Sequence, residues 1–363
     1  MIDRNVFREL DWYLVGLLIL NAALGCLIIY SSSQGQTGHI YLKQIFWVGV
    51  SCLGFFLILL VDYKVLVTYS PIFFAAGLVV LASLIFFGRI VGGAKSWFRL
   101  GFLGIQPSEI MKILLILMLA RIYAEFKKPY VSWARAAAGA GATVIPMALV
   151  AMQPDLGTAS TYVPLILAAL FLAGLNRKTM ILLLVAALGL GLFGWNFAFK
   201  DYQKKRILTL VSPSRDPQGA GYQIAQSKIA IGSGGFLGKG LKKGTQSQLR
   251  FLPARHTDFV FSVLGEEFGF VGVCAALALF SALLRRLFRS VSLARDRAGI
   301  YIIFMVANLL TYQFLVNVLM VVGLFPVTGI PLPFISYGGS SLLVSFLAVG
   351  LVVNVKMRRF ANI

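Results

Sequence analysis

Charge is scarce in this sequence, and acidic charge is the scarcer sign. Charged residues make up 13% of the 363 residues, whereas a water-soluble domain usually carries about 25%. Cysteine and histidine are rare as well, with three and two residues. The three cysteines lie inside apolar runs, which favours buried core residues over a disulfide framework or a metal site. The low charge excludes an ordinary soluble enzyme, and the 59% hydrophobic content excludes intrinsic disorder.

The sequence has long apolar segments instead, and its mean hydropathy is +0.85. A helix that crosses a bilayer needs about 20 mostly apolar residues. Ten segments meet this requirement: 12–31, 44–61, 66–88, 107–124, 136–152, 157–175, 180–199, 260–283, 299–322 and 340–356. The first is too long for the apolar core of a signal peptide, so we expect it to be retained. The sequence therefore predicts an all-α polytopic membrane protein, with residues 1–363 forming a single integral membrane domain.

The net charge of +20 arises from 33 basic against 13 acidic residues, and their positions predict the orientation. With the N-terminus inside, the cytoplasmic segments hold 17 Lys and Arg residues and the short outer loops hold four. This asymmetry follows the positive-inside rule, which counts short loops only. Both termini are therefore expected in the cytoplasm, and the long segment 200–259 between spans seven and eight is expected outside.

The long outer segment 200–259 breaks that asymmetry because it contains 11 further basic residues. One interpretation is a solvated basic face on an anionic membrane. The other is an electrostatic platform for an anionic substrate or a lipid headgroup. Nucleic acid is not an expected partner on this side of the membrane, and no phosphate-binding GxxxxGK[ST] string occurs.

Ionisable residues inside membrane spans are costly and mark functional sites by default. Glu109 and Lys112 are three residues apart at the start of the fourth span, so they share a helix face and can pair. A capped helix start with a structural ion pair would also explain them. Asp155 follows Gln153 and Pro154, much as Glu109 follows Gln106 and Pro107, so both strings are expected at the outer face. We expect Asp155 to pair across helices, with Lys112 or a basic loop residue.

The densest polar string ends where the eighth span begins. It holds Arg250, Arg255, His256, Thr257 and Asp258 within nine residues. A carboxylate at Asp258 could serve as a helix cap. The number of polar groups exceeds what a cap requires, so a site for an anionic, lipid-linked substrate is the alternative.

Three prolines and three glycines between Pro326 and Gly339 forbid a regular helix between spans nine and ten. Irregular backbone at membrane depth persists only where it is buried in protein or lines a cavity. We therefore expect Ser336, Gly338 and Gly339 to lie at a cavity on the outer face.

These strings together resemble the signature of the SEDS family (shape, elongation, division and sporulation). The segment that carries the resemblance contains Asn317, Gly323-Leu324, Pro326, Gly329, Pro333-Phe334 and Ser336-Tyr337-Gly338-Gly339-Ser340-Ser341. The strings around Gln106, Gln153 and Asp258 resemble further shared motifs, and the match extends over essentially the whole chain. The string from Gly244 to Leu249 is more similar to the rod-shape members of the family than to its division members.

The resemblance implies a peptidoglycan glycosyltransferase that polymerises lipid II outside the bacterial cytoplasmic membrane. The proposed catalytic aspartate of the family falls on Asp258, and its cavity residues fall on Glu109, Lys112 and Asp155. In this interpretation Asp258 deprotonates the attacking hydroxyl, while Arg250 and Arg255 stabilise the departing pyrophosphate. No organic cofactor is implied, a divalent cation is left open, and a class B penicillin-binding protein is the expected partner.

One position departs from the family pattern, because Ala254 replaces an acidic residue that often precedes the Arg-His pair. A role for that neighbouring position is therefore not expected. Two alternatives to the enzyme remain. A lipid II flippase would need polar groups that reach both faces, but the cytoplasmic half reads as plain apolar helix. A scaffold that only positions a penicillin-binding protein would need no carboxylate at Asp258.

Overall fold

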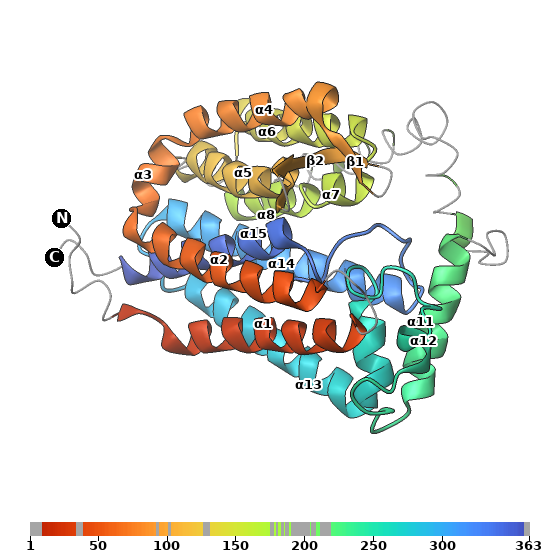
Figure 1. Ribbon diagram of the computed structural model, residues 1–363. Coiled ribbons are helices and arrows are strands. Elements are labelled where there is room, and N and C mark those ends of the chain that lie inside the picture. The colour runs from red at the N-terminus through yellow and green to blue at the C-terminus, as the bar shows by residue number, and fades with distance from the viewer. Residues whose placement is uncertain are drawn as a thin grey trace.

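The computed structural model describes residues 9–33, 39–91, 94–100, 103–125, 131–174 and 219–358, with isolated positions between 175 and 218. Most of its helices run side by side in one bundle, and α11 stands across one end of it (Figure 1). The described elements are, in chain order, α1 Trp12–Ser32, α2 Ile40–Leu60, α3 Tyr63–Thr68, α4 Ser70–Phe87, β1 Arg89–Val91, β2 Ala94–Leu100, β3 Leu103–Ile105, α5 Pro107–Ala124, α6 Trp133–Met152, α7 Leu156–Ser160, α8 Val163–Ala173, α11 Ala220–Gly234, α12 Thr245–Gln248, α13 Val260–Val291, α14 Arg297–Val321 and α15 Gly339–Met357.

The prediction of a polytopic helical membrane protein is confirmed. Eight helical stretches among the described residues are long and apolar enough to cross a membrane. Helix α5, which coincides with the predicted span 107–124, is not one of these eight, because Glu109, Lys112 and Arg121 interrupt its apolar run. The predicted span 180–199 lies almost wholly outside the described residues.

Two predicted spans are each divided by the structure. The segment 66–88 is broken at Tyr69 between α3 and α4, and the segment 157–175 is broken between α7 and α8. Pro71 and Pro164 lie in the first turns of α4 and α8. Proline lacks a backbone N–H and is favoured in the first turn of a helix, where no helical partner is lost, so each of them suits a new helix start.

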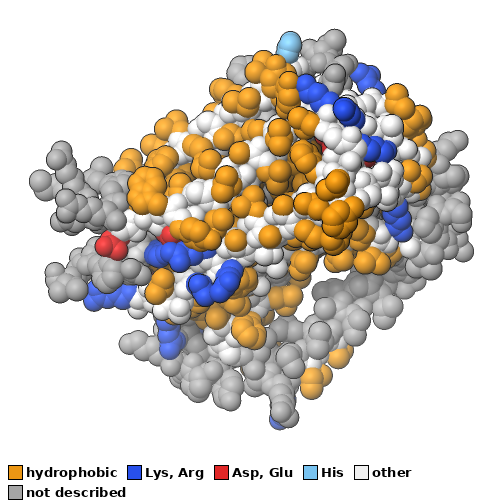
Figure 2. All heavy atoms as spheres, turned by 90° about the horizontal axis from the view of Figure 1, so that it is seen from below, with side chains coloured by type: hydrophobic (Ala, Val, Ile, Leu, Met, Phe, Trp, Pro, Cys, Tyr) orange, Lys and Arg blue, Asp and Glu red, His pale blue; other side chains and the backbone are white. Residues whose placement is uncertain are grey.

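The outer surface of the bundle is apolar around its middle. Large side chains in the middle of α2 and α4, such as Leu53 and Val79, are 61% and 70% exposed, as expected for residues that face lipid rather than water. In Figure 2 hydrophobic side chains cover the centre of the face, while Lys and Arg gather toward its two ends. This distribution is that of a protein with an apolar belt between two charged boundaries.

Helix α5 lies in the interior of the bundle, where it packs against α4, α6, α8, α14 and α15. Its charged residues Glu109 and Lys112 are 3% and 0% exposed. Protein therefore shields both residues from lipid, which explains how a helix with this much charge is accommodated at membrane depth.

The start of α1 and the end of α15 lie together at one end of the bundle. Asp11, just before α1, accepts hydrogen bonds from Arg286 Nε at 2.7 Å and from Lys356 near the end of α15. Burial raises the pKa of Asp11, but these bonds from Arg286 and Lys356 outweigh it and hold the pKa below its ordinary value. Asp11, Arg286 and Lys356 lie at or just beyond the ends of the predicted spans, so this ion-pair network closes one end of the bundle without interrupting the apolar helices.

A small sheet follows α4 and was not predicted. Strands β1, β2 and β3 form an antiparallel sheet in that order, with Arg89 opposite Trp97 and Phe98 opposite Ile105. The strands are too short to give a clear alternating pattern in the sequence. The sheet matters for the site, because β2 reaches the end of the bundle where the polar residues gather.

The predicted outer loop 200–259 also contains regular structure, namely helices α11 and α12. Helix α11 packs along α13, and Gly234 lies against Gly265 so closely that a Cβ there would be 2.0 Å from the Gly265 carbonyl oxygen. The glycines of this stretch therefore permit helix packing at close range.

A second close approach joins α7 to the proline-rich segment 326–338. A Cβ on Gly157 would lie 2.0 Å from the carbonyl oxygen of Thr328, so Gly157→Ala should displace one backbone from the other and cost about 1–3 kcal/mol. Gly141→Ala in α6 is the matched control, because nothing lies within 4 Å of its Cβ and alanine favours a helix. Thermal unfolding of the purified variants checks this, and equal midpoints would contradict it.

Candidate active site

A polar cavity of about 520 Å³ is lined by residues at the starts of α5, α7 and α15. In Figure 1 these helix starts lie at the end of the bundle away from the chain termini. Three of the lining residues are carboxylates, namely Glu109, Asp155 and Asp258. They come from α5, from the turn before α7 and from the turn before α13. Other polar and aromatic lining residues are Ser96, Trp97, Gln106, Thr158, Gln223, Thr257, Thr328, Tyr337 and Ser341.

The two Gln-Pro strings meet in this cavity. Gln106 Nε2 donates a hydrogen bond of 2.9 Å to Asp155 Oδ2. Asp155 also caps α7, accepting from the backbone N–H of Thr158 at 3.0 Å and from its hydroxyl at 2.9 Å. The expectation that both strings lie at one face is confirmed. Among the described residues, the group that reaches Asp155 from α5 is the Gln106 amide rather than the expected Lys112 or a basic loop residue.

Glu109 and Lys112 form the predicted pair, with Glu109 Oε2 2.6 Å from Lys112 Nζ. Lys112 is fully buried and does not line the cavity, whereas Glu109 does. Lys112 therefore lies behind Glu109 and balances its charge from the protein interior. This arrangement gives the cavity wall a carboxylate whose counter-ion cannot be reached from the cavity.

Asp258 lies in a turn whose backbone is held on several sides. Its N–H donates to the Ala254 carbonyl at 3.1 Å, and its own carbonyl accepts from Asn317 Nδ2 at 3.0 Å. The residue at the N-cap of α13 is Phe259, which makes no side-chain cap bond. The Asp258 carboxylate faces the cavity next to Gly329, whose Cβ would lie 3.9 Å from Asp258 Oδ2. The geometry thus favours a site residue over a helix cap.

The irregular segment 326–338 is buried in protein and lines the cavity, as expected for such backbone. Ser336 Oγ donates to the Thr257 carbonyl at 2.5 Å, and the Tyr337 N–H donates to the His256 carbonyl at 2.8 Å. Of the three residues predicted here, Gly338 lines the cavity. Ser336 instead fastens the segment to the Asp258 turn, and Gly339 packs on Trp47, with its Cβ position 2.0 Å from the ring.

The structure does not bring the predicted basic residues into the cavity. Arg255 is 2% exposed and donates to the Ser247 carbonyl, and Arg250 is exposed. Neither residue is among those that line the cavity, nor is His256, which lies edge-on to Tyr337. Among the described lining residues there is no Lys or Arg at all. Their roles as substrate ligands therefore stay predictions without support from the geometry.

Burial and the neighbouring charge of Arg255 lower the pKa of His256. The folded protein thus prefers the neutral imidazole, and the unfolded chain binds the proton first as the pH falls below about 6.5. We expect the unfolding temperature to fall as the pH drops from that value through the lower folded pKa, and His256→Gln to reduce the fall. An unchanged fall in His256→Gln would contradict the assignment.

Trp97 and Gln223 line the cavity but were not identified from the sequence. Trp97 lies on the unpredicted strand β2, and Gln223 lies on the unpredicted helix α11. Both residues lie in short stretches that lack the long apolar run of a membrane span. They could have been assigned to the cavity only if strand β2 and helix α11 had been predicted first. Trp97 and Tyr337 thus add aromatic rings to a cavity lined by carboxylates.

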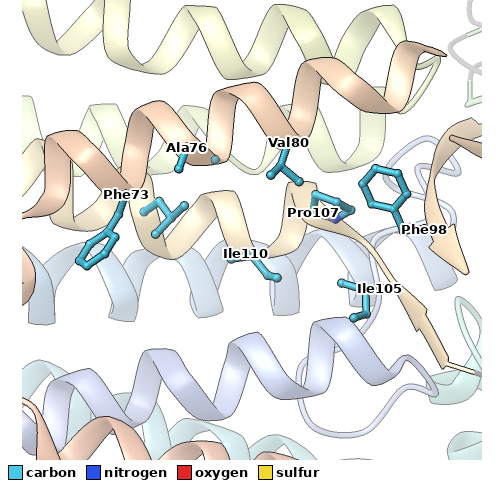
Figure 3. Close-up of a pocket in the computed structure, with 9 residues that line it drawn as sticks. Phe73, Ala76, Val80, Phe98, Ile105, Pro107 and Ile110 are labelled. Carbon is cyan, nitrogen blue, oxygen red and sulfur yellow. The ribbon is translucent and has the colours of Figure 1, made fainter. Parts of the chain in front are cut away.

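An apolar groove of about 460 Å³ adjoins the polar cavity. Figure 3 shows side chains of α4, α5 and the sheet converging on it, and the lining residues are Phe73, Ala76, Gly77, Val80, Phe98, Ile105, Pro107, Ile110 and Leu114. Strand β2 sends Trp97 to the cavity and Phe98 to the groove, and α5 sends Glu109 to one and Ile110 to the other. The same two elements thus form a polar wall and an apolar wall side by side.

The described residues contain no group of three or more His, Cys, Asp or Glu side chains arranged to hold a metal ion. The three cavity carboxylates come from separate elements and do not form such a cluster. The divalent cation that the sequence leaves open stays a prediction.

A helical membrane domain with a carboxylate-lined cavity at one end and an adjoining apolar groove has the form of an integral membrane enzyme that acts on an amphipathic substrate. The model of the cell cycle protein family of FtsW, RodA and SpoVE matches residues 11–360. The chain therefore belongs to this family, the SEDS family of peptidoglycan glycosyltransferases.

Individual relatives support this membership from several branches. The peptidoglycan glycosyltransferase MrdB of Escherichia coli (strain K12) is 38% identical over 348 residues, which cover 94% of this chain and 93% of that protein. A probable peptidoglycan glycosyltransferase FtsW of Trichlorobacter lovleyi is 37% identical, with 97% and 95% covered. The stage V sporulation protein E of Bacillus subtilis (strain 168) is 36% identical, with 95% and 96% covered.

Solved structures share the fold over almost the whole chain. A structure that concerns the coordination of polymerization and crosslinking by a peptidoglycan synthase complex superposes with a TM-score of 0.84 at 32% identity, covering 97% of this chain and 99% of that one. The crystal structure of the rod shape determining protein RodA of Thermus thermophilus has a TM-score of 0.73 at 30% identity, with 97% and 98% covered.

Proposed function

We propose that this protein polymerises lipid II into glycan strands, with Asp258 as the general base. The observation that supports this most is the cavity itself, in which three carboxylates and Trp97 surround about 520 Å³ beside an apolar groove. A disaccharide headgroup suits the polar cavity, and a polyprenyl tail suits the groove, which faces α4 and the start of α5.

In the proposed glycosyl transfer, Asp258 acts as the general base from the cavity wall. Its carboxylate accepts the proton of the GlcNAc 4-hydroxyl of one lipid II. The hydroxyl oxygen forms a new bond to the anomeric carbon of the MurNAc of the growing chain. The bond from that carbon to the pyrophosphate breaks, and its electron pair leaves with the undecaprenyl pyrophosphate. A single displacement inverts the anomeric carbon and gives a β-1,4 link.

The departing pyrophosphate needs a positive environment, and the lining residues offer it through backbone rather than through basic side chains. Helix α15 begins at the cavity, where Gly338 and Ser341 line the wall. Gly338 is the N-cap residue and has no side chain to cap the first N–H groups of the helix. The first N–H groups of a helix and the positive end of its dipole favour an anion. Glu109 shapes the cavity wall in this proposal and takes no part in proton transfer.

We further propose that the cavity lies outside the bacterial cytoplasmic membrane and that both chain termini lie in the cytoplasm. The excess of Lys and Arg in the short loops on the side of the termini supports this orientation. The Asp11–Lys356 contact also supports it, because it joins the start of α1 to the end of α15 at the end of the bundle away from the cavity. A class B penicillin-binding protein would cross-link the new strands. The sequence from Gly244 to Leu249 favours a role in cell elongation and rod shape over a role in division.

A lipid II flippase and a passive scaffold are the competing functions, and one pair of assays separates all three. The purified protein is incubated with lipid II in detergent, and glycan strands are resolved by gel electrophoresis. In parallel, headgroup translocation is measured in liposomes. Polymer without translocation supports the enzyme, translocation without polymer supports the flippase, and neither activity supports the scaffold.

A further inference from the structure

Helix α13 is interrupted shortly after the Asp258 turn. Gly269 has φ 62° and ψ −159°, which no helical residue adopts. The interruption deprives backbone groups on both sides of Gly269 of helical partners. Residues 235–240 satisfy two carbonyls before it and two N–H groups after it through backbone hydrogen bonds of 2.9–3.1 Å to residues 266–271. The first part of α13, residues 260–268, is thereby fixed to a segment that precedes it in the chain by about 30 residues.

The carboxylate of Glu266 extends this attachment. Glu266 is fully buried and accepts four hydrogen bonds from the segment 239–247. Its Oε1 accepts from Lys239 Nζ at 2.9 Å and from the Thr245 hydroxyl at 3.2 Å. The N–H groups of Gln246 and Ser247 donate to the same carboxylate at 2.8 and 3.0 Å. A group that can only accept thus meets donors alone, which is the arrangement a carboxylate satisfies best.

From Ser247 the contacts continue to the Asp258 turn. The Ser247 carbonyl accepts from the guanidinium of Arg255, which is 2% exposed. Arg255 lies three residues before Asp258 in the chain. Glu266 lies eight residues after Asp258, on helix α13, which begins at Val260. The turn is therefore held from both sides by Glu266, once through Ser247 and Arg255 and once through the helix.

We propose that Glu266 is a positioning residue for Asp258, acting through Ser247 and Arg255 without contact to the substrate. This inference depends on the proposed function, since it presupposes that Asp258 receives the proton. It also gives Arg255 a new role, because the buried guanidinium orients the turn from within the protein. A small displacement of a catalytic group can cost a large factor in rate, so a remote clamp of this kind affects turnover more than binding.

Glu266→Gln and Glu267→Gln form a matched pair for the test. The two residues are adjacent and both are fully buried. Glu267 accepts from the Ser31 hydroxyl at 2.6 Å, and a glutamine oxygen can replace it there. In Glu266→Gln, by contrast, the amide NH₂ group must face a donor, because every partner of Glu266 donates.

The full-length protein is assayed with lipid II over a range of substrate concentrations and pH. For Glu266→Gln we expect kcat to fall on the order of 10- to 100-fold while KM changes by no more than about twofold. The acidic limb of the pH profile should also move, because a displaced Asp258 has new surroundings. Mere loss of folded enzyme would lower the plateau without moving the limb. Glu267→Gln should keep both kcat and the pH profile of the unmodified protein.

Lys239→Met provides a second variant if Glu266→Gln does not fold, because Lys239 is partly exposed and contributes one of the four bonds. We expect it to lower kcat and shift the acidic limb in the same direction, by less. Unchanged kcat in a folded Glu266→Gln or in Lys239→Met, or a change confined to KM, would overturn the inference while leaving the proposed function intact. An unmodified protein that makes no polymer would overturn both.

Discussion

Asp258→Asn is expected to reduce glycan polymerisation by about 10²- to 10⁴-fold, the usual contribution of a general base. Asparagine has nearly the same shape as aspartate but cannot accept the proton from the attacking hydroxyl. The turn should stay in place, because it is held by backbone groups. The Asp258 N–H donates to Ala254, and the Asp258 carbonyl accepts from Asn317.

The measurement is polymer yield from purified lipid II over time, with the unfolding temperature recorded for each variant. Asp62→Asn is the control, because Asp62 is a partly exposed carboxylate that caps α3 outside the cavity. It should polymerise like the unmodified protein. Full activity of a folded Asp258→Asn variant would show that the carboxylate does not receive the proton and would remove the basis of the proposed mechanism.

The sequence was sufficient for the features that depend on local pattern. Apolar runs of about 20 residues gave the spans, and the predicted span 107–124 agrees with α5 at both ends. The pairing of Glu109 with Lys112 depends only on helical spacing, and the structure confirms it. The meeting of the two Gln-Pro strings followed from the parity of the spans, and the Gln106–Asp155 bond confirms it.

The features that could not be predicted depend on contacts between distant parts of the chain. Arg255 looked like a ligand for pyrophosphate because it is basic and lies near Asp258, yet the Ser247 carbonyl holds it inside the protein. Glu267 reaches Ser31, a residue 236 positions away. Periodicity carries no information on such pairs. The break at Gly269 was equally hidden, because a glycine within an apolar run is compatible with an unbroken helix.

The buried pair of Glu109 and Lys112 yields the second large effect. Lys112→Met removes the cation but leaves the Glu109 carboxylate, which is 3% exposed, without its counter-ion. Breaking a buried pair in this way costs about 3–5 kcal/mol. The double variant Glu109→Gln with Lys112→Met replaces both charges by neutral groups of similar size, and such replacements are often close to neutral.

Thermal unfolding of the purified single and double variants tests this expectation and supplies its own control. The double variant should be more stable than Lys112→Met alone, so the coupling between the two sites should be large and the single effects should not add. A double variant no more stable than Lys112→Met would mean that the methionine disrupts the packing of α5. A destabilised single variant with a recovered double would assign Lys112 to the support of the cavity wall, because its charge then serves to balance the buried Glu109 carboxylate that lines the cavity.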